Sequence, residues 1–339
     1  MLVHADLRWP LRTGIGVVQA ELLRRTPPGV EILDLGVSAR IGTPLSPVLL
    51  ARSLARHAQS GDVFWSPGFM PPAWSAPPVV VTLHDLNHMH YYSKVHALYY
   101  ELVMKPLYRR CSAIICVSDF TRDELLSWSG ANPEQVFTVY NGVAVDTFAQ
   151  GSRCELGFPY VLYVGNRRRY KNLERLFQAF AITSLPRDGI RLVLTGEPDA
   201  QLQRLAADCN IAQRVQFAGN LTDEELARLY RGARLVAFVS LYEGFGLPIL
   251  EAMAASVPVL TSNVTAMPEI AGNAALTVNP TSIEEIAAGL ERLSADEALR
   301  MQLIQRGRLR ATRFDWDTTA QSTWEIVRRL QRHAHSNAA

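Results

Sequence analysis

Two carboxylates that flank a glycine-rich turn give the strongest chemical signal in this chain. Glu243 and Glu251 are separated by seven residues, and the interval contains Gly244, Gly246 and Pro248. Glycines let the backbone approach a ligand closely, and the free N–H groups at a helix start favour an anion. Pro248 suits the first turn of a helix, which predicts that Glu251 lies in that turn and faces back over the loop. Such a segment could bind phosphates through its amides and sugar hydroxyls through its carboxylates.

The residues around this turn support a loop between a strand and a helix. The apolar run 235–240 precedes Glu243 and is typical of a buried parallel strand, while Phe245 and Leu247 complete the loop. A simpler alternative is an ordinary strand-to-helix turn, with Glu251 as a favourable charge at the helix N-terminus. The other motifs of the chain favour the first interpretation, in which this segment binds a nucleotide sugar through its phosphates and its hydroxyls.

A basic loop is the second candidate site. It runs from Gly165 to Asn172 and contains Arg167, Arg168, Arg169 and Lys171. Arginine can bind a diphosphate by bidentate contacts, and lysine can bind it as a point charge. A solvated loop is the alternative, but the position between a predicted strand and a predicted helix favours a binding role.

Two weaker motifs follow other predicted strands. Gly14 and Gly16 lie before a helix that we expect to begin near Val17, and they would allow close approach to an anionic group. A simple tight turn explains them equally well, and the motif is too short for a dinucleotide fingerprint. Asn220 ends another strand, where backbone groups could meet a nucleotide base.

His84 and Asp85 end a strongly apolar strand, at the edge where open sheets bind ligands. His84 could hydrogen-bond a sugar hydroxyl, and Asp85 could fix its tautomer or contact the acceptor. The nearby His88 and His90 raise the alternative of a metal site. Their spacing matches no familiar zinc pattern and no cysteine joins them, so we expect no metal.

Short apolar runs alternate with helical patterns along the chain, which is typical of parallel α/β architecture. The strands that we expect in the first half are Leu2–Asp6, Ile32–Leu35, Val63–Trp65, Val79–Leu83, Ala113–Val117 and Val136–Val139. Those of the second half are Tyr160–Gly165, Arg191–Thr195, Val215–Ala218, Leu235–Val239, Val257–Thr261 and Ala275–Val278. The stretch Thr147–Pro159 lacks either periodicity, so we place a domain boundary after residue 150. Two doubly wound Rossmann-like domains, 1–150 and 151–315, would then face a central cleft at the carboxyl ends of their strands.

Composition narrows the class of protein. The chain has 339 residues, of which 48% are hydrophobic and 19% charged, which suffices for two folded domains. A net charge of +2 gives no electrostatic case for nucleic acid. The four cysteines form no CxxC pair and indicate reduced thiols in a cytosolic protein. The first residues already resemble a strand, and no apolar run reaches the roughly 18 residues of a membrane span, so we expect neither a signal peptide nor a spanning helix.

The segment Val95–Arg110 has two interpretations. Its apolar and aromatic residues at helical spacing, together with Lys105, Arg109 and Arg110, could form an amphipathic helix that touches anionic lipid. Core packing with solvated basic residues is the more common explanation of such a pattern. Any membrane contact would therefore be peripheral.

Together these motifs resemble the retaining glycosyltransferases of family 4, which have the GT-B fold. The matching segments of the second half are Tyr163-Val-Gly-Asn, Lys171-Asn-Leu173, Leu241–Met253 and Ser262-Asn-Val-Thr-Ala-Met-Pro-Glu-Ile-Ala-Gly272. Those of the first half are Gly14-Ile-Gly16, Thr82-Leu-His-Asp85, Val117-Ser-Asp-Phe-Thr121 and Tyr140-Asn-Gly-Val143. The resemblance thus extends over nearly the whole chain.

The resemblance implies a donor site in the second domain. Lys171 and one arginine would bind the diphosphate, Glu243 would contact the transferred sugar, and Glu251 would bind the ribose hydroxyls. The amides of 244–247 would hold sugar and phosphate oxygens. Many family members carry an arginine immediately before the lysine. Tyr170 stands there in this chain, so the choice among Arg167, Arg168 and Arg169 stays open.

The resemblance also implies roles for the first domain. His84 would contact the sugar from that domain, and the turn with Gly14 and Gly16 would lie near the diphosphate. The final helix of the family crosses back to the first domain, and residues 316–333 would form it here.

The resemblance implies metal-independent transfer of a sugar from a nucleoside diphosphate to a hydroxyl, with retention at the anomeric carbon and no cofactor. We favour front-face attack by the acceptor; a covalent intermediate on a carboxylate is the alternative. The motifs look like those of bacterial mannosyltransferases of surface-polysaccharide assembly. GDP-mannose is therefore the first choice of donor, ahead of GDP-rhamnose or a UDP-sugar. The acceptor would be a glycan or a polyprenyl-diphosphate-linked oligosaccharide, used by a cytosolic enzyme at the inner membrane leaflet.

Two other classes of function remain open. An epimerase of the GT-B fold would bind the same donor but release an altered sugar nucleotide without any acceptor. A catalytically silent sugar-nucleotide binder would bind the donor without turnover.

Overall fold

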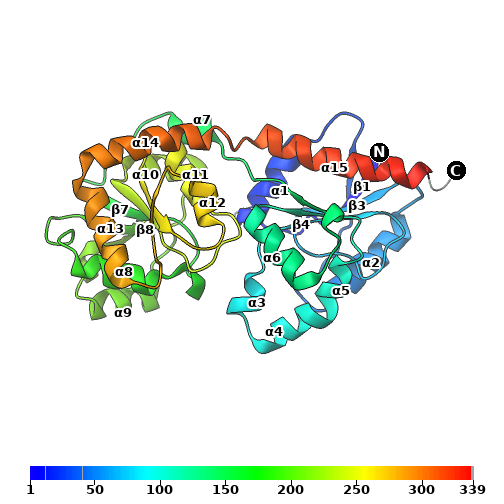
Figure 1. Cartoon of the computed structure of the whole chain (residues 1–339), viewed down its shortest axis with the longest axis horizontal. Helices are drawn as coiled ribbons and strands as arrows, with labels where there is room; N and C mark the ends of the chain where they lie inside the picture. The colour runs from blue at the N-terminus through cyan, green and yellow to red at the C-terminus, as the bar shows by residue number, and fades with distance from the viewer. Residues whose placement is uncertain (12, 40, 337–339) are drawn as a thin grey trace. The chain divides into compact units, whose positions relative to one another are not determined.

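The chain folds into two compact units. The computed structural model describes residues 1–11, 13–39 and 41–336, with side chains as far as Gln331. Unit 1 contains Met1–Gly142 and the chain from Trp316 onward, and unit 2 contains Val143–Asp315 (Figure 1). Within the described ranges, no helix is both long enough and apolar enough to cross a bilayer.

The division lies between Gly142 and Val143, earlier than the boundary after residue 150 that the sequence suggested. Helix α7 (Val145–Ala149) packs against α11 (Leu247–Ala254), which belongs to unit 2. The guanidinium of Arg231 donates a hydrogen bond to the carbonyl of Phe148 at 3.1 Å. These tertiary contacts hold residues 143–150 in unit 2, and no sequence periodicity signals them.

Unit 1 is built on a parallel sheet of six strands in the order β2-β1-β3-β4-β5-β6. The strands are β1 (Leu2–Ala5), β2 (Glu31–Asp34), β3 (Val63–Ser66), β4 (Val79–Leu83), β5 (Ala113–Cys116) and β6 (Val136–Thr138). The six predicted strands are confirmed, with ends that differ by at most one residue. Every residue of the central strands β3 and β4 is buried, as expected for apolar strands covered on both faces by helices.

The helices of unit 1 lie between these strands, except for the last. They are α1 (Gly14–Arg24), α2 (Ser46–His57), α3 (Asn87–Tyr91), α4 (Lys94–Tyr99), the π-helical η1 (Tyr100–Met104), α5 (Lys105–Tyr108), α6 (Asp119–Ser129), the 3₁₀ turn η2 (Pro133–Gln135) and α15 (Trp316–Ser336). Helix α15 packs against α1 and β3 (Figure 1), and the Trp324 ring lies 4.9 Å from that of Trp65. The C-terminal helix therefore belongs to unit 1, although the residues before it belong to unit 2.

Helix α1 begins earlier than the sequence suggested. The hydroxyl of Thr13 accepts a hydrogen bond from the amide of Gly16 at 3.0 Å, so Thr13 caps a helix that starts at Gly14 rather than near Val17. Gly14 and Gly16 thus lie in the first helical turn. A Cβ at Gly16 would lie 2.0 Å from the carbonyl oxygen of Pro10, so the chain's own backbone requires glycine at this position.

The segment 95–110 has one buried face and one exposed face. Its inner face is buried in the core of unit 1, through Tyr100, Met104, Leu107 and Tyr108. Its outer face, on α4 and η1, leaves apolar side chains exposed. Core packing therefore explains one side of this helical segment but not the other.

Unit 2 is built on a second parallel sheet of six strands, in the order β12-β11-β10-β7-β8-β9. The strands are β7 (Tyr160–Tyr163), β8 (Arg191–Leu194), β9 (Val215–Phe217), β10 (Leu235–Phe238), β11 (Val259–Ser262) and β12 (Leu276–Val278). All six were predicted, with ends within two residues. Each unit is therefore doubly wound.

The helices of unit 2 cover both faces of this sheet (Figure 1). Besides α7 and α11, they are η3 (Arg169–Lys171), α8 (Leu173–Ile182), α9 (Ala200–Asp208), η4 (Ala212–Arg214), α10 (Asp223–Gly232), α12 (Met267–Ala271), α13 (Ile283–Ala295) and α14 (Glu297–Ala311). Helix α8 buries Leu173, Leu176, Phe177 and Phe180, the apolar positions at helical spacing. This packing fixes the loop that precedes α8.

Candidate functional site

A lysine–carboxylate pair lies at the carboxyl edge of the unit 2 sheet. Lys171 follows β7 and Glu243 follows β10, and these strands are neighbours in the sheet. The Nζ of Lys171 lies 2.7 Å from Oε1 of Glu243, and the two side chains are only 9% and 12% exposed. The ammonium also lies 5.0 Å from the centre of the Phe238 ring. The structure thus brings together two predicted site residues that are 72 positions apart in the chain.

Local structure around Asn172 positions the lysine. Asn172 has a φ of 61°, in the left-handed region that asparagine tolerates better than most residues. Its buried amide donates hydrogen bonds to the carbonyls of Val239 (2.9 Å) and Pro280 (2.7 Å). The amide of Leu241 donates to the carbonyl of Tyr170 at 2.7 Å. The basic loop is therefore attached to the end of β10, where Glu243 lies.

Thr265 positions the carboxylate, and the sequence motifs gave it no role. Its Oγ1 accepts a hydrogen bond from the amide of Glu243 at 3.2 Å, and the amide of Ala266 donates to the Glu243 carbonyl at 3.3 Å. Thr265 itself has a φ of 57°, which is rare for a β-branched residue and costs on the order of 1–3 kcal/mol. The only sequence signal was its place within the family segment Ser262–Gly272.

The glycine-rich turn presents backbone rather than side chains. Phe245 is buried and packs edge-on against Phe314, with ring centres 5.9 Å apart. Gly246 has a φ of 105° and precedes α11, whose first residue is Leu247. Within the described part of the chain, no side-chain hydrogen bond caps this helix. Backbone amides of 244–247 are therefore the groups of this turn that could meet an anion.

Glu251 lies deeper in α11 than predicted. It is the fifth residue of the helix, beyond the first turn, because the helix begins at Leu247. Its Oε2 accepts a hydrogen bond from the hydroxyl of Tyr230 at 2.6 Å. Burial raises the pKa of the Glu251 carboxyl to about 7, although the bond from Tyr230 works in the opposite direction. Tyr230, on α10, is a site residue that the sequence did not reveal.

The three arginines of the basic loop have different surroundings. Arg167 lies over the Phe217 ring at 5.1 Å, donates to the carbonyl of Thr195 at 3.3 Å, and lies 3.7 Å from Asp199. Arg168 and Arg169 are exposed. Among the described residues, no side-chain partner of Arg169 is found. Contacts within unit 2 therefore hold the Arg167 side chain, and Arg169 is the arginine that is more available to bind a ligand.

Asn220 lies just after the end of β9, as predicted, and its side chain is exposed. Its side-chain amide donates to Oε1 of Glu197 at 3.1 Å, and Gly196 and Gly219 form a short antiparallel bridge beside it. Asn220 and Glu197 thus form a polar rim at the carboxyl edge of β8 and β9.

In unit 1, His84 follows β4 at the carboxyl edge of that sheet. Its Nε2 donates a hydrogen bond to the carbonyl of Pro67 at 2.7 Å. Burial lowers the pKa of His84 to about 4, so the ring is neutral near pH 7 and its Nδ1 is a hydrogen-bond acceptor. The Asp85 carboxylate instead accepts bonds from the amide (3.1 Å) and side chain (3.2 Å) of Asn87. Pro67, rather than Asp85, therefore fixes the His84 tautomer.

The neighbouring histidines have other partners. His90 lies 2.7 Å from Glu124, and His88 stacks on Tyr100 with ring centres 5.1 Å apart. Across residues 1–11, 13–39 and 41–336, no three His, Cys, Asp or Glu side chains group in a way that could hold a metal ion.

The comparisons with known proteins agree with this architecture. Residues 22–147 match the family described as Glycosyltransferase Family 4, and residues 146–310 match Glycosyl transferases group 1. The chain is 30% identical over 260 residues to O-antigen chain mannosyltransferase B of Escherichia coli, covering 72% of this chain and 68% of that protein. It is 28% identical over 245 residues to the O-antigen chain mannosyltransferase RfbU of Salmonella typhimurium, covering 71% of this chain and 67% of that protein.

The solved structures show the same fold. The HepE protein of Anabaena, in complex with UDP and glucose, superposes with a TM-score of 0.75 at 18% identity, covering 96% of this chain and 98% of that one. Two doubly wound units with a site at the strand ends thus define a protein of the GT-B fold. The chain belongs to the group 1 and family 4 glycosyltransferases, and it is a hexosyltransferase.

Proposed function

We propose that this enzyme transfers mannose from GDP-mannose to a hydroxyl of a growing glycan, with retention of the anomeric configuration. The names of the relatives from Escherichia coli and Salmonella typhimurium support mannose and surface-polysaccharide assembly. The observation that carries the site assignment is the largely buried Lys171–Glu243 pair at the carboxyl edge of the unit 2 sheet. Unit 2 would bind the donor, and unit 1 would bind the acceptor.

In this proposal the basic loop and the glycine-rich turn bind the donor's diphosphate. Lys171 and Arg169 supply positive charge, and the amides of 244–247 supply hydrogen bonds. Negative charge builds up on the leaving phosphate in the transition state, and fixed donors in a dry site stabilise it strongly. These groups take the part that a metal ion plays in other phosphate sites, so transfer should proceed without one.

The two carboxylates of the motif have separate parts in the proposal. Glu243 orients the transferred sugar by accepting hydrogen bonds from its hydroxyls. Because Lys171 neutralises much of its charge, Glu243 is a weak nucleophile, which favours front-face attack over a covalent intermediate. Glu251 accepts hydrogen bonds from the ribose, and His84 accepts one at Nδ1 from a sugar hydroxyl.

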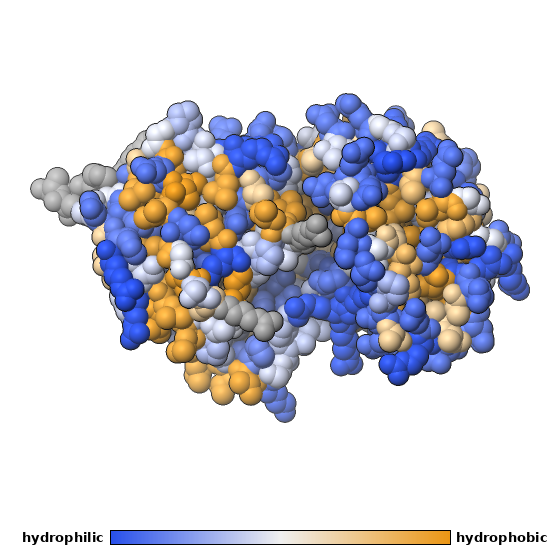
Figure 2. All heavy atoms as spheres, turned by 180° about the vertical axis from the view of Figure 1, so that it is seen from behind, coloured by the Kyte–Doolittle hydropathy of each residue, from blue (hydrophilic) through white to orange (hydrophobic). Residues whose placement is uncertain are grey.

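The outer face of the α4–η1 segment supports a lipid-linked acceptor. Val95, Leu98 and Leu102 are 74%, 57% and 65% exposed, and the exposed Pro106 extends the same stripe at helical spacing. Residues 91–110 contain four lysines and arginines against one carboxylate. Figure 2 shows apolar side chains gathered at the tip of unit 1 where α4 lies. We propose that this stripe rests on an anionic membrane surface that holds a polyprenyl-diphosphate-linked acceptor.

One transfer assay tests the reaction, and one vesicle assay tests the membrane contact. Purified enzyme with GDP-mannose and a mannose-terminated acceptor should form an α-linked product, read from its anomeric NMR signals. Release of a changed sugar nucleotide without an acceptor, or donor binding without any turnover, would contradict this proposal. Flotation with anionic vesicles should be lost on Leu98→Glu with Leu102→Glu but kept on Met301→Glu with Leu309→Glu, which alters exposed apolar residues of unit 2.

A further inference from the structure

Unit 1 contains a trough at the amino-terminal edge of its sheet, where the proposed reaction places no residue. Its volume is about 790 Å³, which is in the range of small-molecule binding pockets. Residues 58–61 before β3, residues 71–79 leading into β4, and Leu107 with residues 110–112 before β5 line it. His84 follows the other end of β4, about 16 Å away at the usual rise of a strand. The trough is therefore separate from the proposed reaction site.

A proline-rich loop forms one wall of the trough and exposes an indole ring. The prolines of this wall are Pro71, Pro72, Pro77 and Pro78. Trp74 lies between them and is 51% exposed. Proline fixes φ, so the wall has its shape before any ligand arrives, which reduces the entropy cost of binding.

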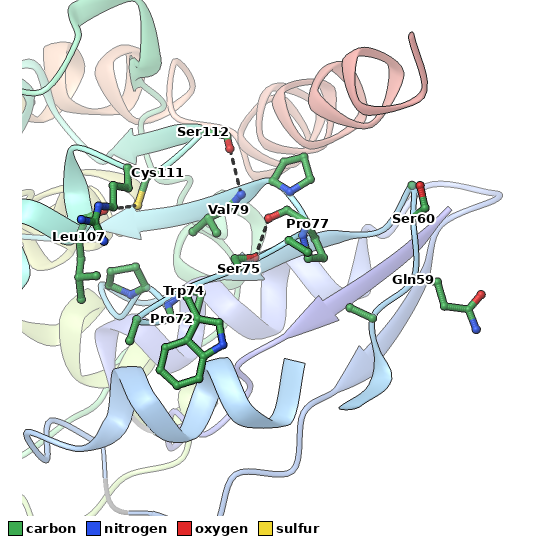
Figure 3. A pocket seen from close by; sticks show the side chains of 17 residues that line it. Gln59, Ser60, Pro72, Trp74, Ser75, Pro77, Val79, Leu107, Cys111 and Ser112 are labelled. Atoms are coloured by element: carbon green, nitrogen blue, oxygen red, sulfur yellow. Dashed lines mark hydrogen bonds between the residues drawn. The ribbon is translucent and has the colours of Figure 1, made fainter. Parts of the chain in front are cut away.

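One hydrogen bond lies within the wall, and a second joins the first residue of β4 to the segment before β5. The hydroxyl of Ser75 donates to the carbonyl of Pro77 at 2.6 Å, and the amide of Val79 donates to the hydroxyl of Ser112 at 3.1 Å (Figure 3). These two bonds help to fix the shape of the trough.

Other polar groups of the lining are available to a ligand. In the part of the chain that the structure describes, no side-chain partner is found for Gln59, Ser60 or Arg110, nor for the indole N–H of Trp74. Figure 3 shows Trp74 beside Pro72, with Gln59 and Ser60 well separated from it along the lining. The trough is therefore extended, with an aromatic surface at one place and hydrogen-bonding groups at others.

These features fit a chain of neutral sugars. The apolar face of a pyranose packs on an indole ring, and its hydroxyls accept and donate hydrogen bonds to amide, hydroxyl and guanidinium groups. Arg110 is the only Lys or Arg among the lining residues, which is too little charge for a nucleic acid or a membrane surface. We propose that the trough binds a segment of the glycan acceptor remote from its reacting end. This inference rests on the proposed function, because that function supplies the glycan.

Binding of a linear α-mannohexaose to the whole enzyme tests the trough without catalysis. NMR should show the Trp74 indole N–H signal shifting on titration with the hexasaccharide. Trp74→Ala should weaken binding about tenfold, as expected for loss of one aromatic contact, and Trp74→Phe should restore most of it. Ile182→Ala, at an exposed apolar position of unit 2, should change nothing.

Transfer kinetics separate this inference from the proposed function. Trp74→Ala should raise KM for a long mannan acceptor and leave KM for GDP-mannose and for a short acceptor unchanged. If the enzyme transfers no mannose at all, the proposed function fails, but the hexasaccharide titration still reports on the trough. Unchanged hexasaccharide binding in Trp74→Ala would overturn the inference, as would an indole signal that responds to anionic vesicles and not to the hexasaccharide.

Discussion

The carboxyl edges of the two sheets hold their functional side chains in different ways. In unit 2, Lys171 and Glu243 bind each other, and residues with left-handed backbone fix both of them. In unit 1, His84 is neutral and is held by one hydrogen bond to the Pro67 carbonyl. A charged, tightly connected site suits a diphosphate that must be stabilised in the transition state. A neutral acceptor of hydrogen bonds suits hydroxyls, which differ from one glycan to another.

Removal of the Lys171 charge should have the largest effect. Lys171→Ala leaves Glu243 without its partner in a largely buried position and removes the phosphate contact. We expect kcat/KM for transfer to fall about 10²–10³-fold, the range for loss of one charged stabilising group. Steady-state kinetics with GDP-mannose would measure it.

A double variant sharpens this prediction. Glu243→Gln in the Lys171→Ala background removes the unpaired charge, so folding stability should recover while transfer stays low. Recovery of transfer together with stability would mean that the pair is only structural.

His84→Ala should lower transfer about a hundredfold, because an orienting hydrogen bond in the transition state is lost. GDP affinity should change less than twofold, since His84 lies in unit 1 and holds no phosphate in the proposal. Transfer kinetics and calorimetric GDP affinity, measured on the same preparation, test whether His84 acts in transfer without binding the nucleotide. A loss of GDP affinity as large as that of Lys171→Ala would contradict the separate roles of the two sheet edges.

The two edges should also respond to pH in opposite directions. The folded pKa of His84 is about 4, below its usual 6.5, so its contribution to stability is present above pH 6.5 and is lost as pH falls through 4. The folded pKa of Glu251 is about 7, above its usual 4.5, so its contribution is present below pH 4.5 and is lost as pH rises through 7.

Urea unfolding of Glu251→Gln would measure the second effect. Between about pH 5 and about pH 8.5, the wild type should lose on the order of 1–3 kcal/mol of unfolding free energy relative to this variant. A difference that does not change with pH would show that Glu251 is already ionised at pH 5 in the folded protein.

Thr265 should give the smallest effect. Thr265→Ala removes the hydroxyl that fixes the Glu243 amide, and we expect donor affinity to fall about three- to tenfold, as for loss of one hydrogen bond. Thr265→Ser keeps the hydroxyl and should bind the donor like the wild type. Equal loss in both variants would assign the effect to the backbone rather than to the hydrogen bond.

The sequence predicted the fold well, since apolar runs at strand and helix spacing are local patterns. All twelve strands were found, including Val79–Leu83 without any shift. Local sequence patterns did not predict the contacts between elements that are distant in the chain. The Tyr230–Glu251 bond joins two helices, and Thr265 has an unusual backbone conformation that its residue type does not suggest.

Small errors in the expected ends of elements also had consequences. We predicted Glu251 in the first turn because Pro248 indicated a helix start. The helix α11 begins at Leu247, however, so Glu251 is its fifth residue. The expected start of α1 missed Thr13 as the cap, and so Gly16 was interpreted as a ligand contact or part of a tight turn rather than as a residue of the first helical turn.

The most direct test of the donor site is calorimetric titration of the wild type with GDP and with UDP, without magnesium. We predict that GDP binds at least about tenfold more tightly than UDP, a difference of about 1.4 kcal/mol, and that Lys171→Ala loses most of this affinity. Binding of neither nucleotide, or GDP binding that is unchanged in Lys171→Ala, would contradict the assignment of the Lys171–Glu243 site.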